Sequence, residues 1–210
     1  MVIAFDLDGT LLNTIEDLHE SLNYVLSLYK YNKVSLDDTR QFLGNGIRNL
    51  IIKGAKTDIN IDKMFVDFKN YYEANCMNKT FVYDGIKDLI IKLKENGHKI
   101  VCITNKNYII SELLIENYFP SLFDLVLGDG MGYKRKPDCE IINALIDKMG
   151  CKKEDIIYFG DSEVDAKTII NSNIKGALVS YGFRDKELLK EFNLEILDNA
   201  HEIELFINRN

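Results

Sequence analysis

The 210-residue sequence has no apolar run long enough to cross a membrane. The first apolar strand that we expect begins at residue 2, which leaves no room for a signal peptide ahead of it. The four cysteines lack the paired spacing of a metal site. Because Cys102 and Cys151 lie in or beside apolar runs, we expect them to be buried free thiols. These absences predict a soluble, cytoplasmic protein.

The chain also lacks an excess of positive charge. It has 26 lysines and arginines against 33 aspartates and glutamates, which gives a formal net charge of −7. This balance argues against a general nucleic-acid or anionic-membrane surface, so we expect neither partner. An anionic substrate would therefore need a local cationic pocket or a metal ion. The hydrophobic content of 46% suffices for one core and a smaller second domain.

The segment at residues 2–10 has the most informative pattern. Four apolar residues predict a strand buried on both faces, and Asp6, Asp8 and Gly9 follow it. Side chains two residues apart in an extended chain point the same way. Both carboxylates can therefore face one volume at the carboxyl end of the strand, where open parallel sheets bind ligands. A lone Asp-x-Asp is more often a polar turn, so the other strand ends must decide.

Residues 15–79 show helical periodicity and no convincing strand. Helices are expected near residues 14–29, 35–44, 47–55 and 61–77. Thr14 and Asp17 are expected to cap the first helix as a variant of the capping box. An all-helical insert directly after the first strand of an α/β fold indicates a separate cap domain. We place this cap at residues 15–79 and the core domain at residues 1–14 and 80–210.

A glycine-rich turn lies inside this insert. Gly44, Asn45 and Gly46 precede Arg48 at the expected start of a helix. The two glycines can arrange backbone N–H groups around an anion, and the Arg48 guanidinium suits a carboxylate or a phosphate. The same residues fit a helix–turn–helix elbow with a solvated arginine equally well.

The second half of the chain alternates between helices and strands. Strands are expected at residues 99–103, 125–127, 156–159 and 176–179, with helices between them and a last helix at 202–207. Repeated β-α-β units predict a right-handed, mostly parallel sheet covered by helices.

Polar side chains follow two more of these strands. Thr104 and Asn105 end one strand, and Asp161 and Asp165 follow another. Each pair alone is usually a cap or a turn. Two acid pairs that converge on one crevice repel each other and cannot all stay ionised without a cation. An all-oxygen site with room for water molecules suits Mg²⁺.

Lys136 adds one mobile positive charge, and Pro137 stiffens the chain beside it. A carboxylate nucleophile, an acid/base carboxylate, Mg²⁺, a lysine and a hydroxyl are the groups that phosphoryl transfer requires. A Lys-Pro pair alone is usually a loop. Four such features in this order, each after a strand, are hard to obtain by chance.

The four motifs together resemble those of the haloacid dehalogenase superfamily of phosphatases. They are Asp6-x-Asp8-Gly9-Thr10, Thr104-Asn105, Lys136-Pro137 and Gly160-Asp161-x-x-x-Asp165. The resemblance covers the whole chain. It implies a Rossmann-like α/β fold, with a doubly wound, mostly parallel sheet and an inserted all-helical cap of the C1 type. Within the superfamily the chain is most similar to the phosphoglycolate phosphatases, from which Cys139 and Tyr181 are small departures.

The resemblance implies a role for each acid. Asp6 would attack phosphorus and form an aspartyl-phosphate. Asp8 would protonate the leaving alcohol and then activate water. The side chains of Asp6 and Asp161 and the backbone carbonyl of Asp8 would hold Mg²⁺. Asp165 would act through a bound water or by orienting Lys136.

The resemblance also implies the substrate contacts. Thr104, Asn105 and Lys136 would neutralise the phosphoryl oxygens. Arg48 and the amides of residues 44–46 would meet the rest of the substrate when the cap closes. The implied partner is a small-molecule phosphate ester, and the implied assembly is a monomer or a weak homodimer.

Several other functions share parts of this pattern. An inorganic pyrophosphatase or a sugar-phosphate mutase of the β-phosphoglucomutase type would share the core motifs and differ mainly in the cap. A phosphonatase would use a cap lysine, for which Lys53 and Lys56 are available. A dehalogenase is disfavoured because it needs no acid at position 8. A non-catalytic regulator would be expected to have lost Asp6 or Asp8.

Overall fold

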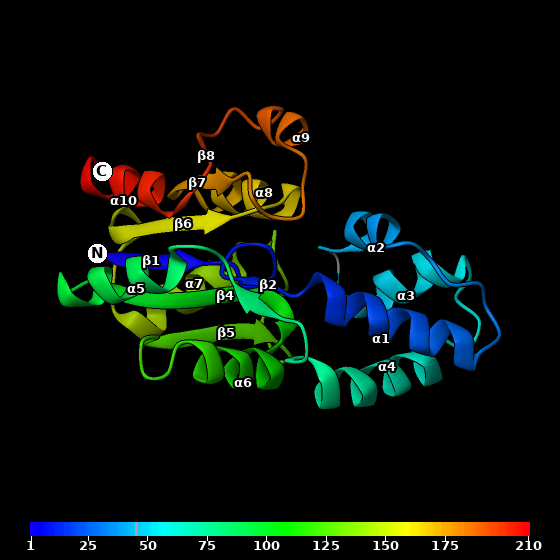
Figure 1. The fold of residues 1–210 in the computed structure, drawn as a ribbon. Coiled ribbons are helices and arrows are strands. Elements are labelled where there is room, and N and C mark those ends of the chain that lie inside the picture. Colours follow the sequence, from blue (N-terminus) through cyan, green and yellow to red (C-terminus); the bar gives the residue numbers. More distant parts are fainter. Residues whose placement is uncertain (45) are drawn as a thin grey trace. The chain divides into compact units, whose positions relative to one another are not determined.

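The computed structural model describes residues 1–44 and 46–210, and the chain divides into two compact units. The sheet unit comprises Met1–Leu12 and Val82–Asn210, and the helical unit comprises Asn13–Phe81 (Figure 1). Two short strands, β2 (Leu12–Asn13) and β3 (Phe81–Val82), pair with each other where the chain passes from one unit to the other.

Six strands form the sheet of the sheet unit. They are β1 (Val2–Phe5), β4 (Lys99–Asn107), β5 (Leu125–Asp129), β6 (Ile156–Gly160), β7 (Lys175–Val179) and β8 (Ile196–Leu197). Their order in the sheet is β5-β4-β1-β6-β7-β8, and each neighbouring pair is parallel. The expected Rossmann-like, doubly wound parallel sheet is therefore confirmed.

The winding of the chain reverses beside β1. After β1 the chain adds β4 and β5 on one side, and it then crosses over to add β6, β7 and β8 on the other. In such sheets the ligand crevice lies outside the carboxyl ends of the strands at this reversal. The residues that follow β1, β4 and β6 are therefore the candidates for a ligand-binding site.

Apolar packing covers both faces of the sheet. Val2 and Ala4 join a buried cluster with α7 (Glu140–Met149) and α8 (Glu163–Ser172). On the opposite face Phe5 stacks on Phe159, whose ring contacts Phe206 in α10 (Ala200–Asn208). Burial on both faces explains why β1 is apolar without alternation. The other elements of this unit are α5 (Ile86–Glu95), α6 (Tyr108–Tyr118), α9 (Lys186–Lys190) and the 3₁₀ turn η1 (Lys153–Asp155).

The sheet unit differs from the sequence expectation at β4, β8, α9 and Cys151. Strand β4 continues to Asn107, four residues beyond the expected end, with an irregularity in its pairing after Ile103. The edge strand β8 and the helix α9 were not expected, because two and five residues are too short to show a period. Cys102 is a buried free thiol as expected, whereas Cys151 is only partly covered.

The helical unit contains α1 (Ile15–Leu28), α2 (Leu36–Phe42), α3 (Ile47–Ala55) and α4 (Ile61–Asn75). Helix α1 packs against the other three through one buried stripe, because its apolar residues recur every three or four positions. Gly54 of α3 lets that helix approach the side chains of Leu22 and Leu26, where a Cβ would lie 3.1 and 3.3 Å from their methyl groups. Among the described residues, no helix is both long and apolar enough to span a membrane.

Asp17 has a different role from the capping role that the sequence suggested. Thr14 is the N-cap residue of α1 as expected, but its side chain makes no capping hydrogen bond within the described residues, so the expected capping-box variant is wrong. The buried Asp17 carboxylate instead accepts hydrogen bonds from the backbone N–H groups of Lys79 and Thr80, at 2.9–3.1 Å, and from the Thr80 hydroxyl at 2.8 Å. It therefore joins the start and the end of the helical unit.

Candidate functional site

The chain turns tightly directly after β1. Asp6 extends the strand by donating its backbone N–H to the carbonyl of Phe159 at 2.8 Å. The N–H groups of Leu11 and Leu12 then bond to the carbonyl of Leu7, both at 3.0 Å. Gly9 has a φ of +86°, and a Cβ there would overlap the Asp161 carboxylate. The turn therefore needs glycine both for its conformation and for its close approach to Asp161.

Three buried carboxylates meet beside this turn. Oxygens of Asp6, Asp161 and Asp165 lie within 4.8 Å of one another. Burial raises the pKa of Asp6 to about 7, although the nearby Lys136 lowers it, and Asp165 raises it further. Burial, followed by the charges of Asp165 and Asp6, also raises the pKa of Asp161 well above its usual range. These carboxylates ionise together readily only if a cation joins them.

Three glycines let the carboxylates of the cluster pack closely against the backbone. A Cβ at Gly160 would overlap the carboxylate of Asp165, and a Cβ at Gly182 would overlap Asp161, as at Gly9. Five carboxylates and three cations surround this crevice, namely Asp6, Asp8, Asp161, Glu163, Asp165, Lys106, Lys136 and Arg184. Their formal charges leave an excess of two negative charges, which one divalent cation offsets. A hard cation with oxygen ligands fits this donor set.

Lys136 connects two of the acids. Its ammonium lies 2.8 Å from Asp6 Oδ1 and 2.7 Å from Asp165 Oδ1, and its side chain is 2% exposed. Burial alone would lower the pKa of Lys136, but Asp165 and Asp6 outweigh it and raise the pKa. The carbonyl of Lys136 accepts a hydrogen bond from Asn105 Nδ2 at 3.0 Å, and the following Lys136–Pro137 peptide bond is cis. Asn105 thus positions the segment that carries Lys136.

Asp165 is held by hydrogen bonds on both oxygens. Ser162, the N-cap of α8, donates its N–H and its hydroxyl to Asp165 Oδ2 at 3.1 and 2.6 Å. Tyr158 donates its hydroxyl to Asp165 Oδ1 at 2.7 Å and accepts from Lys136 at 2.8 Å. Burial alone would raise the pKa of Asp165, but Lys136 and these hydrogen bonds lower it. The arrangement suits a carboxylate that orients Lys136.

Sequence reasoning missed Lys106 and Tyr158. The ammonium of Lys106 lies 2.8 and 3.0 Å from the two oxygens of Asp8. Thr104 and Lys106 are two apart in β4 and are both buried, so they share a face of the strand. Extending the predicted strand past residue 103 would have revealed Lys106. Tyr158 had no signal, because it lies inside an apolar strand.

The loop after β7 completes the crevice. Phe183 donates its backbone N–H to Asp161 Oδ2 at 2.6 Å, and Tyr181 donates its hydroxyl to the carbonyl of Thr10 at 3.0 Å. The guanidinium of Arg184 donates to both oxygens of Glu163, at 2.6 and 3.1 Å. This loop therefore fixes the orientation of Asp161.

The remaining predicted residues belong to the helical unit, whereas the acids, Thr104, Asn105 and Lys136 belong to the sheet unit. Gly44 and Gly46 have φ values of +101° and +82°, and Asn45 lies outside the described residues. Arg48, in the first turn of α3, donates to Asp62 Oδ1 at 2.6 Å and lies over the ring of Phe65 at 4.6 Å. Arg48 is therefore already paired with a carboxylate of its own unit.

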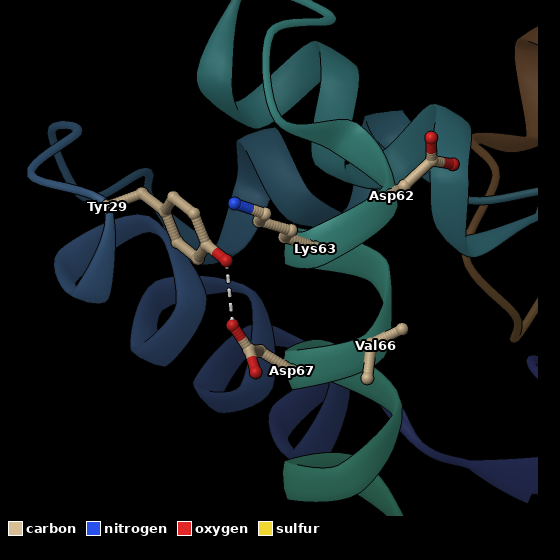
Figure 2. A pocket seen from close by; sticks show the side chains of 5 residues that line it. All are labelled: Tyr29, Asp62, Lys63, Val66 and Asp67. Atoms are coloured by element: carbon tan, nitrogen blue, oxygen red, sulfur yellow. Dashed lines mark hydrogen bonds between the residues drawn. The ribbon is translucent and has the colours of Figure 1, made fainter.

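The helical unit also contains a cavity of about 440 Å³, shown in Figure 2. Its lining residues are Tyr29, Asp62, Lys63, Val66 and Asp67. Figure 2 shows the Tyr29 hydroxyl pointing to Asp67, to which it donates a hydrogen bond of 2.8 Å. The cavity lies outside the carboxylate cluster, and the two acids in its lining each pair with a side chain of this unit, Asp62 with Arg48 and Asp67 with Tyr29.

Comparison with known proteins gives a consistent result. A family model described as haloacid dehalogenase-like hydrolase matches residues 3–179. A phosphoglycolate phosphatase of Cereibacter sphaeroides is 33% identical over 189 residues, which is 87% of this chain and 86% of that protein. One from Caulobacter vibrioides is 31% identical over 88% of this chain and 81% of its own length. A crystal structure of a predicted phosphatase from Clostridium acetobutylicum has 25% identity and a TM-score of 0.89, and it covers 100% of this chain and 98% of its own.

Proposed function

The chain is a phosphatase of the haloacid dehalogenase-like hydrolase family, and on this premise we propose that it hydrolyses phosphoglycolate with the help of Mg²⁺. One observation carries the chemistry. The two acids that follow β1 each contact a buried lysine, Asp6 with Lys136 at 2.8 Å and Asp8 with Lys106 at 2.8 Å. Two acids side by side, each with its own cation, suit two different roles in one reaction.

Asp6 is the nucleophile of the proposed reaction. One of its oxygens attacks phosphorus, the bond from phosphorus to the ester oxygen breaks, and Asp8 gives its proton to the leaving alcohol. Asp8 then takes a proton from a water molecule, which attacks the phosphorus of the aspartyl-phosphate. The bond between phosphorus and Asp6 breaks, and inorganic phosphate leaves. Lys136, positioned by Asp165, Tyr158 and Asn105, neutralises charge on the phosphoryl oxygens together with Thr104.

The proposed reaction includes Mg²⁺ bound by the acidic residues. The side chains of Asp6 and Asp161 and the carbonyl of Asp8 would hold Mg²⁺, while Asp165 orients Lys136 or acts through a water molecule. When bound, the ion supplies positive charge to the phosphoryl oxygens and allows the clustered carboxylates to ionise together. The support is the oxygen-only donor set, the excess negative charge, and the close approach of three buried carboxylates.

The substrate assignment rests on the relatives and on the helical unit. The named relatives are phosphoglycolate phosphatases at 31–33% identity. In this proposal the helical unit acts as a cap, and residues 44–46 and Arg48 meet the substrate carboxylate. Arg48 pairs with Asp62, whose side chain is 84% exposed, so a substrate carboxylate would replace a well-solvated partner. Such a replacement costs little, because exposed ion pairs contribute little stability.

A substrate panel tests this assignment. Purified enzyme with Mg²⁺ is assayed for kcat/KM on phosphoglycolate, an aryl phosphate, pyrophosphate and β-glucose 1-phosphate, with EDTA as the metal control. We expect phosphoglycolate to rank first and EDTA to stop all turnover. If pyrophosphate or the hexose phosphate leads by tenfold or more, the phosphoglycolate assignment is wrong, although the phosphatase chemistry stands.

A further inference from the structure

Lys106 is a buried lysine that the proposed reaction sequence does not yet use for substrate binding. It lies near the carboxyl end of β4, and its side chain is 3% exposed. Its ammonium contacts both oxygens of Asp8, at 2.8 and 3.0 Å. A buried lysine is costly unless it is paired, and Asp8 is the carboxylate that pairs with it here.

The two buried lysines contact different acids. Lys136 contacts Asp6 and Asp165, which places its charge beside the phosphoryl group that Asp6 attacks. Lys106 contacts Asp8, which gives its proton to the leaving oxygen. The charge of Lys106 therefore lies on the side of the leaving group. Asp8 is the more open member of this pair, with 23% of its side chain exposed against 3% for Lys106.

The dimensions of the leaving group match this position. In phosphoglycolate one carbon separates the carboxylate from the ester oxygen, so the nearer carboxylate oxygen lies about 3 Å from that oxygen. When the ester oxygen bonds to Asp8, its carboxylate comes within reach of an ammonium that also bonds to Asp8. The Lys106 ammonium donates to both oxygens of Asp8, so a substrate carboxylate that binds there would share these N–H donors with Asp8.

We propose that Lys106 binds the carboxylate of the leaving group and selects phosphate esters with a negative charge next to the ester oxygen. The inference rests on the proposed function, because it requires Asp8 to face the leaving group. It assigns the specificity for an anionic substrate to the sheet unit as well as to Arg48. A compact, strongly hydrated ammonium suits a small carboxylate, and a charge-assisted hydrogen bond of this kind is among the stronger ones.

The test compares two substrates that differ in the charge of one group. Phosphoglycolate and its neutral amide, phosphoglycolamide, have nearly the same size, and the ratio of their kcat/KM values measures selectivity for the carboxylate. The variants are Lys106→Met, Lys106→Gln and Lys106→Arg in the full chain with Mg²⁺, and Arg48→Met is compared with them because Arg48 is the other proposed contact of the carboxylate. Circular dichroism identifies the variants that fold, and the Gln variant serves if the Met variant does not.

We expect Lys106→Met to lower kcat/KM on both substrates, because Asp8 loses its partner, but to lower the selectivity ratio about ten- to hundredfold. Lys106→Arg should retain most of the ratio because it keeps the charge. An equal loss on both substrates would show that Lys106 only positions Asp8 and would overturn the proposal. A ratio that falls in Arg48→Met alone would assign the carboxylate to the helical unit and overturn it as well.

Failure of the substrate assignment is distinguishable from failure of this inference. If the enzyme prefers pyrophosphate, phosphoglycolate is the wrong substrate, but the leaving group is still an anion. Lys106→Met must then lower the ratio of pyrophosphate to methyl phosphate hydrolysis about tenfold or more. If that ratio does not change, or if a neutral hexose phosphate leads the panel, the inference about Lys106 is wrong.

Discussion

Removing the hydroxyl of Tyr158 tests how much its hydrogen bonds to Asp165 and Lys136 stabilise the fold. It donates to Asp165 Oδ1 at 2.7 Å and accepts from Lys136 Nζ at 2.8 Å, and the residue is fully buried. Tyr158→Phe removes this hydroxyl and leaves the ring in place. A hydrogen bond to a charged group contributes about 1.5–3 kcal/mol, so we expect the free energy of unfolding to fall by about that amount.

The matched control is Tyr181→Phe, which removes a hydroxyl that bonds to the neutral carbonyl of Thr10 at 3.0 Å. Hydrogen bonds to neutral groups contribute about 0.5–1.5 kcal/mol, so this variant should lose less stability. Urea unfolding at neutral pH measures both differences. Because Lys136 keeps its contacts with Asp6 and Asp165, kcat/KM of Tyr158→Phe should fall by about tenfold or less. A loss below about 0.5 kcal/mol, or equal losses in the two variants, would refute the charged network.

Three further predictions concern other carboxylates. Asp8→Ala should lower hydrolysis of alkyl phosphates more than that of aryl phosphates, whose leaving groups need little protonation, and equal losses would argue against Asp8 as the acid. Asp17→Ala should lower the free energy of unfolding by about 3 kcal/mol or more, because the N–H groups of residues 79 and 80 lose a buried carboxylate, and a change under about 1 kcal/mol in urea unfolding would contradict this. Burial alone would raise the pKa of Asp124, but bonds from Lys94, Ile100 and Lys99 lower it. Its contribution to stability is thus present above the unfolded pKa of about 4 and is lost as the pH falls through the lower folded pKa. Acid unfolding of Asp124→Asn should therefore lack this part of the pH dependence, and identical pH profiles would contradict the assignment.

The sheet and the principal acids were predictable because each carries a strong local signal. The apolar run before Asp6 indicates a doubly buried strand, and parallel strands in a doubly wound sheet bring their carboxyl ends to one edge. Because Asp6 and Asp161 each follow a predicted strand, the sequence indicated that the two carboxylates could meet. The structure adds that the Asp161 carboxylate packs directly against Gly9, where any larger residue would overlap it.

The remaining features depend on contacts that have no local signature. Lys106 lies beyond the point where the apolar pattern of β4 ends, so it looked like part of a loop. The hydroxyl of Tyr158 in β6 bonds to Asp165 in α8, seven residues further along the chain. Asp17 resembled a capping residue, but its partners lie 62 and 63 residues away in the sequence. Pairings at such distances arise from tertiary packing, which local propensity does not describe.

The most direct test of the proposed chemistry is to locate the covalent intermediate. Enzyme turning over substrate with Mg²⁺ is quenched with acid and treated with borohydride, which reduces an acyl phosphate to an alcohol, and peptides are then analysed by mass spectrometry. We expect reduction at Asp6 only. We also expect Asp6→Asn to fold normally but not to turn over, because this variant keeps the shape of the side chain and loses the nucleophile. Reduction at another acid, or most of the activity remaining in Asp6→Asn, would show that Asp6 is not the nucleophile.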